Sequence, residues 1–113
     1  MTATIESVRP VVGDAVLRCH FHDTRNTATA NAVAAYQAEI SVLDASVGGT
    51  GGCPFAPNAT GNVATEDLLY LFERMGVYTG IDHEATIATG RWLGEQLGKD
   101  LPAAVARAGW WPE

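Results

Sequence analysis

Two segments decide the fold: AVLRCHF at residues 15–21 and ISVLDASV at residues 40–47. Each is a short, largely apolar run of strand length. The alanine-rich stretch over residues 31–39 predicts a helix between them. Its small side chains form a stripe suited to packing on a sheet, namely Ala30, Val33, Ala34 and Ala38. A strand, a helix and a second strand make a βαβ unit, so we expect the two strands to pair in parallel.

Two histidines follow one another at the end of the first predicted strand. Alternate side chains share a face of a strand. One face would carry Val16, Arg18, His20 and His22, and the other Leu17, Cys19 and Phe21. His20 and His22 therefore emerge on the same side, about 7 Å apart along the strand, and both rings can reach one ion. In the purely structural alternative, one histidine hydrogen-bonds Asp23 and the other is exposed.

A glycine-rich stretch, VGGTGGCPF at residues 47–55, follows the second predicted strand. Its glycines permit positive φ values, and they lead directly to Cys53. Alone, the stretch fits a flexible connection with an incidental cysteine as well as it fits a reactive thiol. In parallel α/β proteins, however, ligands bind at the carboxyl ends of the strands, where His20, His22, Cys53 and Asn62 would meet. Two imidazoles and an amide oxygen suit Mn²⁺, Fe²⁺, Zn²⁺ or Mg²⁺, and spacing does not choose between them.

The rest of the chain is predicted to be helical. Leu68, Leu71, Phe72 and Met75 have helical spacing, after a first turn that contains Thr65 and Asp67. Gly76 ends that helix. The next helix runs over residues 82–97, with Asp82 as its N-cap and Gly98 just past its end. A last helical turn starts at Pro102 and stops before Gly109.

These elements divide the chain into five parts of one partial domain. They are the end of a helix (1–14), the βαβ unit (15–47), the glycine-rich cysteine loop (48–64), the C-terminal helices (65–109) and a tail (110–113). The tail carries two adjacent tryptophans, Trp110 and Trp111, which need an apolar surface.

Length and charge restrict the function classes. A chain of 113 residues forms one ordinary domain, and its net charge of −6 argues against nucleic acid or an anionic membrane as partner. No apolar run approaches the length of a membrane span, and the first ten residues lack the apolar core of a signal peptide. Nothing suggests secretion, so we expect reduced cysteines and a cytoplasmic protein.

Four runs of sequence together resemble hydroxymethylglutaryl-CoA lyase, a family of the metal-dependent TIM-barrel lyases and synthases. The runs are HFHDT (20–24), DASV (44–47), GGCPFA (51–56) and GNVATED (61–67). The resemblance covers residues 16–97, and the Cys-Pro pair with the GNVATED run is its most specific part. Related condensing enzymes, the isopropylmalate and homocitrate synthases, lack that Cys-Pro pair in the matching loop.

The resemblance implies a role for each matched residue. His20, His22 and Asn62 would be ligands of Mg²⁺ or Mn²⁺, and Cys53 the catalytic residue on a lid. His20 is a second candidate for proton transfer. Supporting positions around the site and loop would be Asp23, Glu66, Gly51 and Gly52. The implied reaction is cleavage of 3-hydroxy-3-methylglutaryl-CoA to acetyl-CoA and acetoacetate, as in leucine catabolism and ketone-body formation.

The same resemblance implies that this chain is the carboxyl-terminal fragment of a (β/α)₈ barrel. A barrel needs about 250 residues. The two predicted strands would match strands 7 and 8, leaving six strands, an aspartate ligand and an arginine outside this sequence. We expect either part of a longer or split lyase, or an inactive remnant or assembly subunit that keeps a metal-binding corner. Partners would be an acyl-CoA and the missing amino-terminal barrel part or a second copy. A different 3-hydroxyacyl-CoA remains open as the substrate.

Four positions depart from the family pattern: Asn26, Thr50, His83 and Thr86. Asn26 would lie beside the site, where it could alter the acyl pocket. His83 is expected to be exposed in a first helical turn.

Overall fold

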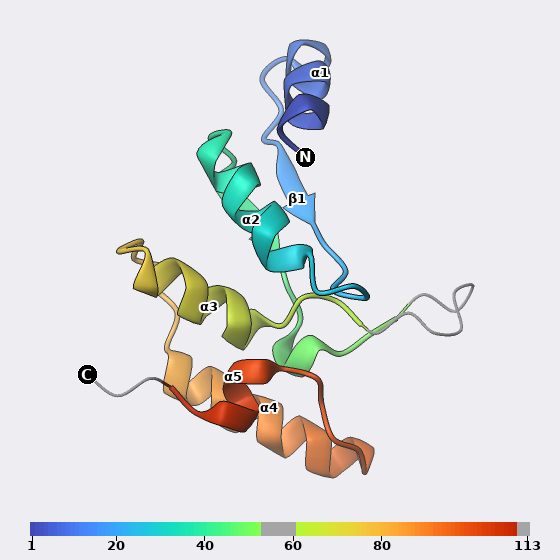
Figure 1. The fold of residues 1–113 in the computed structure, drawn as a ribbon, viewed down its shortest axis with the longest axis vertical. Coiled ribbons are helices and arrows are strands. Elements are labelled where there is room, and N and C mark those ends of the chain that lie inside the picture. Colours follow the sequence, from blue (N-terminus) through green and yellow to red (C-terminus); the bar gives the residue numbers. More distant parts are fainter. Residues whose placement is uncertain (53–60, 111–113) are drawn as a thin grey trace.

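The computed structural model describes residues 1–52 and 61–110 (Figure 1). The elements in chain order are α1 (Thr2–Val12), β1 (Arg18–His20), α2 (Ala28–Gln37), β2 (Val42–Asp44), the 3₁₀ turn η1 (Val47–Gly49), α3 (Thr65–Arg74), α4 (His83–Leu97) and α5 (Ala104–Ala108). In Figure 1, α1, β1 and α2 occupy one end of the molecule, α4 and α5 the other, and α3 lies between them. Across the described residues, no helix is both long and apolar enough to span a bilayer.

The two strands pair in parallel, as the βαβ pattern predicts. Their register places Arg18 opposite Val42 and His20 opposite Asp44. Each strand has three residues, fewer than the apolar runs from which they were predicted. The reason is a change of partner at the strand ends. Beyond β1, His22 bridges Asn62, and beyond β2, Ser46 bridges Ala64. The segment that enters α3 therefore becomes the pairing partner at both strand ends.

The predicted alternation along β1 is confirmed. Phe21 is buried, and Leu17 and Cys19 are partly buried against the core. On the opposite face His20 and His22 are exposed. The core that positions this strand contains Ile5 from α1, alanines from α2, Ile40, Val63, and Leu68 and Phe72 from α3.

The predicted packing stripe of α2 is wrong in part, although Ala38, one of its four members, packs against the core. The buried alanines are Ala28, Ala32 and Ala35, whereas Ala30 is exposed. Alanine occupies so many positions that apolar periodicity cannot choose one face of this helix. The helix also begins earlier than the alanine-rich pattern indicated, at Ala28, whose N–H donates to Asp23 Oδ1 at 2.8 Å.

The two long C-terminal helices follow the predicted signals. Leu68, Leu69 and Phe72 of α3 are buried, while Met75, the outermost member of the predicted stripe, is 41% exposed. Helix α4 starts after Asp82, whose carboxylate accepts the Ala85 N–H, and ends at Gly98, which has a φ of 61°.

The short helix α5 starts at Ala104 rather than at Pro102. The cause is a long-range cap: the Asp67 carboxylate accepts the N–H groups of Ala104 and Val105, at 3.1 and 2.8 Å. The first residue of the tail is held as well. Trp110 stacks on His83 with ring centroids 3.9 Å apart, so the expectation of an exposed His83 is wrong. Trp111 lies outside the described residues.

Candidate functional site

The site begins with the two histidines at the end of β1. The ring centroids of His20 and His22 lie 5.3 Å apart, with their planes at 70°. The Asp23 carboxylate accepts the Ala28 N–H, and within residues 1–52 and 61–110 no hydrogen bond or ion pair joins it to His20 or His22, whereas the structural alternative required one. Both rings therefore share one exposed face of the strand.

Asn62 comes to the same face through an antiparallel bridge with His22. The flanking hydrogen bonds run from Asp23 N–H to Gly61 O (3.3 Å) and from Val63 N–H to Phe21 O (3.0 Å). This pattern makes His22 and Asn62 a non-hydrogen-bonded pair, whose Cβ atoms lie about 5 Å apart on one side. The Asn62 amide nitrogen donates to Thr50 O at 3.0 Å, which leaves Oδ1 as the atom available to a ligand.

Glycine is required where the loop closes on Asn62. A Cβ at Gly61 would overlap the carbonyl oxygens of Gly49 and Gly51. At Gly51, where φ is +94°, a Cβ would lie 2.9 Å from Asn62 Nδ2. Gly51, which the sequence predicted as a supporting position of the loop, therefore lies close to the Asn62 side chain. Gly61 was not singled out from the sequence. Cys53 lies outside the described residues, and Gly52, just before it, is exposed.

Glu66 holds the start of the glycine-rich stretch, at Gly48, in place. Its side chain is 1% exposed, and both carboxylate oxygens accept the Gly48 N–H, at 3.0 and 2.9 Å. Gly90 of α4 leaves room for the carboxylate, because a Cβ there would overlap Oε1. Burial raises the pKa of the Glu66 carboxyl, and its backbone hydrogen bonds oppose that rise.

His20, His22 and Asn62 can supply some of the ligands that a divalent cation needs. Two imidazoles that bind one ion at about 2.1 Å have centroids about 5 Å apart, which agrees with the observed ring separation. Two nitrogens and one amide oxygen make three ligands, fewer than Mg²⁺ or Mn²⁺ requires. Residues 1–52 and 61–110 contain no group of three or more His, Cys, Asp and Glu side chains placed to hold a metal. These residues therefore fit one part of a coordination shell.

A cavity of about 200 Å³ adjoins Asn62. The residues that line it include Asp23, Asn26, Gly61, Asn62, Pro102 and Arg107. Four parts of the chain line it: the turn after β1, η1, the segment before α3, and the segment that runs from Pro102 into α5. Nothing in the local sequence pattern could have indicated that Arg107 lies here.

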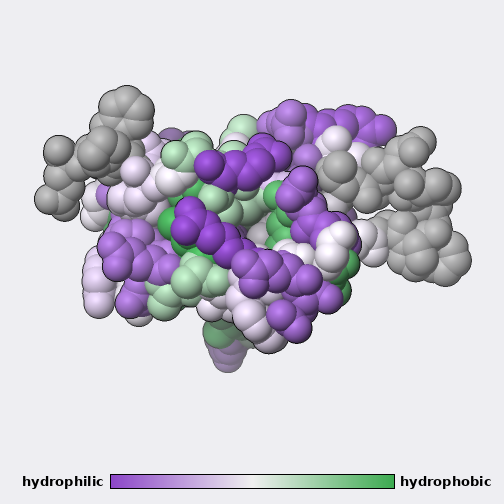
Figure 2. All heavy atoms as spheres, turned by 90° about the horizontal axis from the view of Figure 1, so that it is seen from below, coloured by the Kyte–Doolittle hydropathy of each residue, from purple (hydrophilic) through white to green (hydrophobic). Residues whose placement is uncertain are grey.

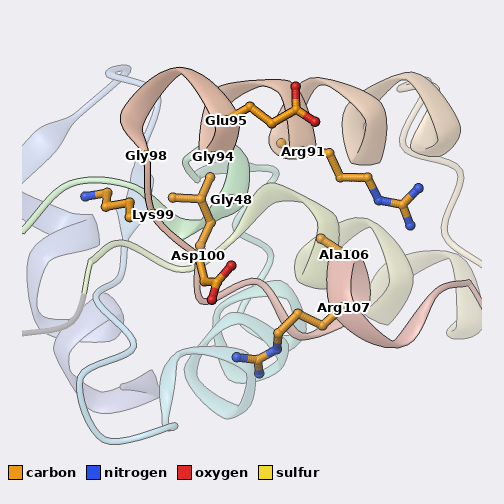
Figure 3. A pocket seen from close by; sticks show the side chains of 11 residues that line it. Gly48, Arg91, Gly94, Glu95, Gly98, Lys99, Asp100, Ala106 and Arg107 are labelled. Carbon is orange, nitrogen blue, oxygen red and sulfur yellow. The ribbon is translucent and has the colours of Figure 1, made fainter.

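A larger hollow of about 720 Å³ lies between α4 and α5, away from the histidines (Figure 3). Its lining includes Gly48, Arg91, Gly94, Lys99, Leu101 and Arg107. In Figure 3 the side chains of Arg91 and Lys99 point away from one another, so the cations do not converge on one point. Figure 2 views the molecule from below Figure 1 and shows apolar side chains within a rim of polar ones.

Comparison with known proteins shows the family to which the chain belongs. The HMGL-like family matches residues 1–93. The (R)-citramalyl-CoA lyase of Chloroflexus aurantiacus is 50% identical over 109 residues, which are 96% of this chain and 34% of that protein. The hydroxymethylglutaryl-CoA lyase of Bacillus subtilis is 50% identical over 84 residues, covering 74% of this chain and 28% of that protein.

Solved structures agree. An HMG-CoA lyase from Acinetobacter baumannii, in complex with coenzyme A and 3-methylmalate, has a TM-score of 0.88 and 42% identity over 96% of this chain and 35% of that one. The hydroxymethylglutaryl-CoA lyase of Pseudomonas aeruginosa has a TM-score of 0.86 and 44% identity over 95% of this chain and 36% of that one. The chain thus spans about a third of the length of these relatives.

Proposed function

Because the chain belongs to the HMGL-like family, we propose that it forms part of a metal-dependent lyase that cleaves a carbon–carbon bond in a 3-hydroxyacyl-CoA. The observation that carries the proposal is the shared face of His20, His22 and Asn62. The favoured substrate is 3-hydroxy-3-methylglutaryl-CoA, which would yield acetyl-CoA and acetoacetate.

The fold supports an assignment within a barrel. The chain is α/β with two parallel strands, and its solved relatives are TIM barrels of the lyase family. We assign β1 and β2 to strands 7 and 8 of such a barrel. The other six strands would come from the part of the relatives that this chain does not match, and would complete the coordination shell. A two-stranded sheet with both edges open is marginal alone, which favours such a partner.

Each residue of this chain would then have a separate task. His20 and His22 would bind the cation through ring nitrogens, and Asn62 through Oδ1. The cation, Mg²⁺ or Mn²⁺, would stabilise developing negative charge on substrate oxygens. Asp23 caps α2 and so fixes the turn that follows the histidines. Glu66 holds Gly48 and thereby fixes the base of the loop that leads to Cys53.

The proton transfers follow from the products. A base removes the proton of the tertiary hydroxyl group, and the bond between the carbinol carbon and C2 then breaks. The electron pair of that bond passes to C2 and forms the enolate of acetyl-CoA, while the hydroxyl carbon becomes the ketone of acetoacetate. The enolate must take up one proton at C2, and we assign its delivery to Cys53, with His20 as the alternative donor.

A second substrate is favoured by one observation. The relative that is 50% identical over 96% of this chain is named as an (R)-citramalyl-CoA lyase. Citramalyl-CoA carries its free carboxylate directly on the carbinol carbon, so the same bond cleavage would give acetyl-CoA and pyruvate. An inactive subunit that keeps only the metal-binding corner is the alternative outside the enzyme class.

The decisive experiment is reconstitution. The 113-residue chain is purified and assayed with Mn²⁺ on both acyl-CoA substrates, alone and with a matching amino-terminal barrel part from a relative. We expect activity only in the mixture. Activity of the isolated chain would show that no further strands are needed. A mixture that forms a complex and binds Mn²⁺ but cleaves neither substrate would favour the inactive subunit.

Variants of the reconstituted protein separate the roles. His22→Ala should weaken Mn²⁺ binding at least tenfold, because it removes a direct ligand. Cys53→Ala should lower kcat strongly and leave Mn²⁺ affinity unchanged. His83→Ala is the matched control, since that histidine stacks on Trp110 and should affect neither quantity. Full turnover by Cys53→Ala would remove the thiol from the mechanism.

A further inference from the structure

The cavity beside Asn62 contains two polar side chains that the proposed metal site does not use, Asn26 and Arg107. They come from opposite ends of the chain: Asn26 from the turn after β1, and Arg107 from the last helix. The cavity volume of about 200 Å³ suits a small group and is far too small for coenzyme A.

The backbone fixes Asn26 firmly in this place. Its N–H donates to Asp23 O at 3.1 Å and closes a tight turn. Its φ of 54° lies in the left-handed region, which asparagine tolerates better than most residues. Within the described residues, no hydrogen bond engages its side-chain amide.

A different interaction, the capping of α5 by Asp67, positions Arg107. The Asp67 carboxylate caps the first turn of α5, so the helix that carries Arg107 is attached to α3. Among residues 1–52 and 61–110, the only ion pairs are Arg18–Asp44 and His83–Glu73, so the Arg107 guanidinium is unpaired there. Figure 3 shows its side chain extending away from α4.

One acidic and one basic residue line the cavity, and the acidic one is already engaged by the backbone. Asp23 is the acidic residue in the lining, and its Oδ1 accepts the Ala28 N–H at the start of α2, where the helix dipole favours negative charge. Arg107 and Asn26 line the space beside Asn62, and both side chains carry N–H donors. A guanidinium binds a carboxylate through two parallel hydrogen bonds, which makes a carboxylate the ligand that these donors match best.

We propose that Asn26 and Arg107 form the subsite for the free carboxylate of the acyl group. This inference rests on the proposed function, because Asn62, the proposed metal ligand, lines the same cavity. The subsite selects 3-hydroxyacyl-CoA substrates that carry a second acid group and discriminates against neutral ones, since an unpaired guanidinium and amide would be left without a ligand.

The test uses the 113-residue chain reconstituted with the amino-terminal barrel part, and a small probe. Free 3-hydroxy-3-methylglutarate is titrated into ¹⁵N-labelled protein in the presence of Mg²⁺, with the neutral diamide of the same acid as comparison. We expect saturable shifts of the Asn26 and Arg107 side-chain resonances with the acid and none with the diamide. Arg107→Met should weaken binding of the acid at least tenfold. Arg91→Met, which removes a cation from the larger hollow only, should not change it.

Asn26→Gly is the second variant, because glycine adopts a positive φ without strain and the turn should persist. It should weaken binding of the acid severalfold. Equal affinity of Arg107→Met and wild type, or equal binding of acid and diamide, would overturn the subsite. So would the absence of saturable binding by wild type. Mn²⁺ broadening of the His20 and His22 resonances is recorded on separate samples of the same proteins without Mg²⁺, so a failure of the metal site is recognised separately.

Discussion

The two sides of the candidate site are built in opposite ways. His20, His22 and Asn62 sit on a surface made by a strand end and a bridge, and both histidines are exposed. On the other side, Glu66 is 1% exposed, and both of its oxygens are hydrogen-bonded to the backbone of Gly48. The two histidines of this proposed ligand face are exposed, whereas Glu66, the anchor of the loop, is buried and its hydrogen-bond partner lies within this chain.

We infer from this difference which residues act on stability and which are free to act in the proposed chemistry. Buried polar groups with full hydrogen bonding fix a local structure, and removing one partner leaves the other unsatisfied. Exposed side chains such as those of His20 and His22 contribute little to folding and remain free for a ligand. We therefore expect substitutions on the anchor side to act on the free energy of unfolding, and substitutions of ligand-face side chains to act on binding.

Gly61→Ala should produce the largest loss of stability, because Gly61 lies next to Asn62 and yet determines the local backbone structure. Its Cβ would overlap the carbonyl oxygens of Gly49 and Gly51, which are backbone atoms and cannot rotate away. We expect a loss of about 3 kcal/mol in the free energy of unfolding, the upper end for overpacking. Urea unfolding measures it, and faster hydrogen exchange of the Asp23 N–H should show that the bridge has opened.

The control is Gly76→Ala, because Gly76 has a φ of +78° and no atom lies within 4 Å of the position that an added Cβ would occupy. It should cost only about 1–2 kcal/mol, because an alanine there must adopt the left-handed conformation. Equal losses in the two variants would show that the close approach at Gly61 has no special weight.

Glu66→Ala should rank second. It leaves the Gly48 N–H without its acceptor and opens a cavity beside Gly90. An unsatisfied buried donor costs about 1–3 kcal/mol, so we expect a loss of about 2 kcal/mol by urea unfolding. Glu66→Gln keeps one acceptor oxygen and should lose less than half as much. A neutral effect of Glu66→Ala would contradict the anchoring role.

The sequence predicted local features of this molecule well. Asp82 and Gly98 bound α4 as expected, because an N-cap and a left-handed glycine act within one helical turn. Alternation along β1 placed His20 and His22 on one face, since side-chain direction follows from the strand itself. The family-specific runs also pointed correctly to the lyases.

Long-range contacts were not predictable in the same way. No local pattern predicts that Arg107 and Asn26 line one cavity, or that Asp67 caps a helix 37 residues later in the chain. The buried face of α2 was missed because alanines lie on opposite sides of this helix, so apolar periodicity does not select one face. Gly61 was overlooked because its neighbours are carbonyl groups of a different loop segment.

The pH dependence of the free energy of unfolding should also reveal the role of Glu66. Burial raises the folded-state pKa of Glu66 above its usual value of 4.5. Between these two values the folded state binds more protons than the unfolded state, so stability falls as pH rises. The stability of wild type relative to Glu66→Gln should therefore be highest below pH 4.5 and decrease upward through the folded pKa. Parallel pH profiles of the two proteins, measured by urea unfolding, would contradict this.

Arg18→Met should have the smallest effect, and it tests the exposed side of the comparison. Arg18 Nε lies 3.4 Å from Asp44 Oδ2, on the same strand face as the histidines, with side-chain exposures of 67% and 34%. An exposed pair contributes about 0–1 kcal/mol, reduced further by salt. We expect a loss below about 0.5 kcal/mol at moderate ionic strength. A double-mutant cycle with Asp44→Asn isolates the coupling between the two charges. A coupling well above that range would mean that the ligand face, like the anchor, contributes to the stability of this chain.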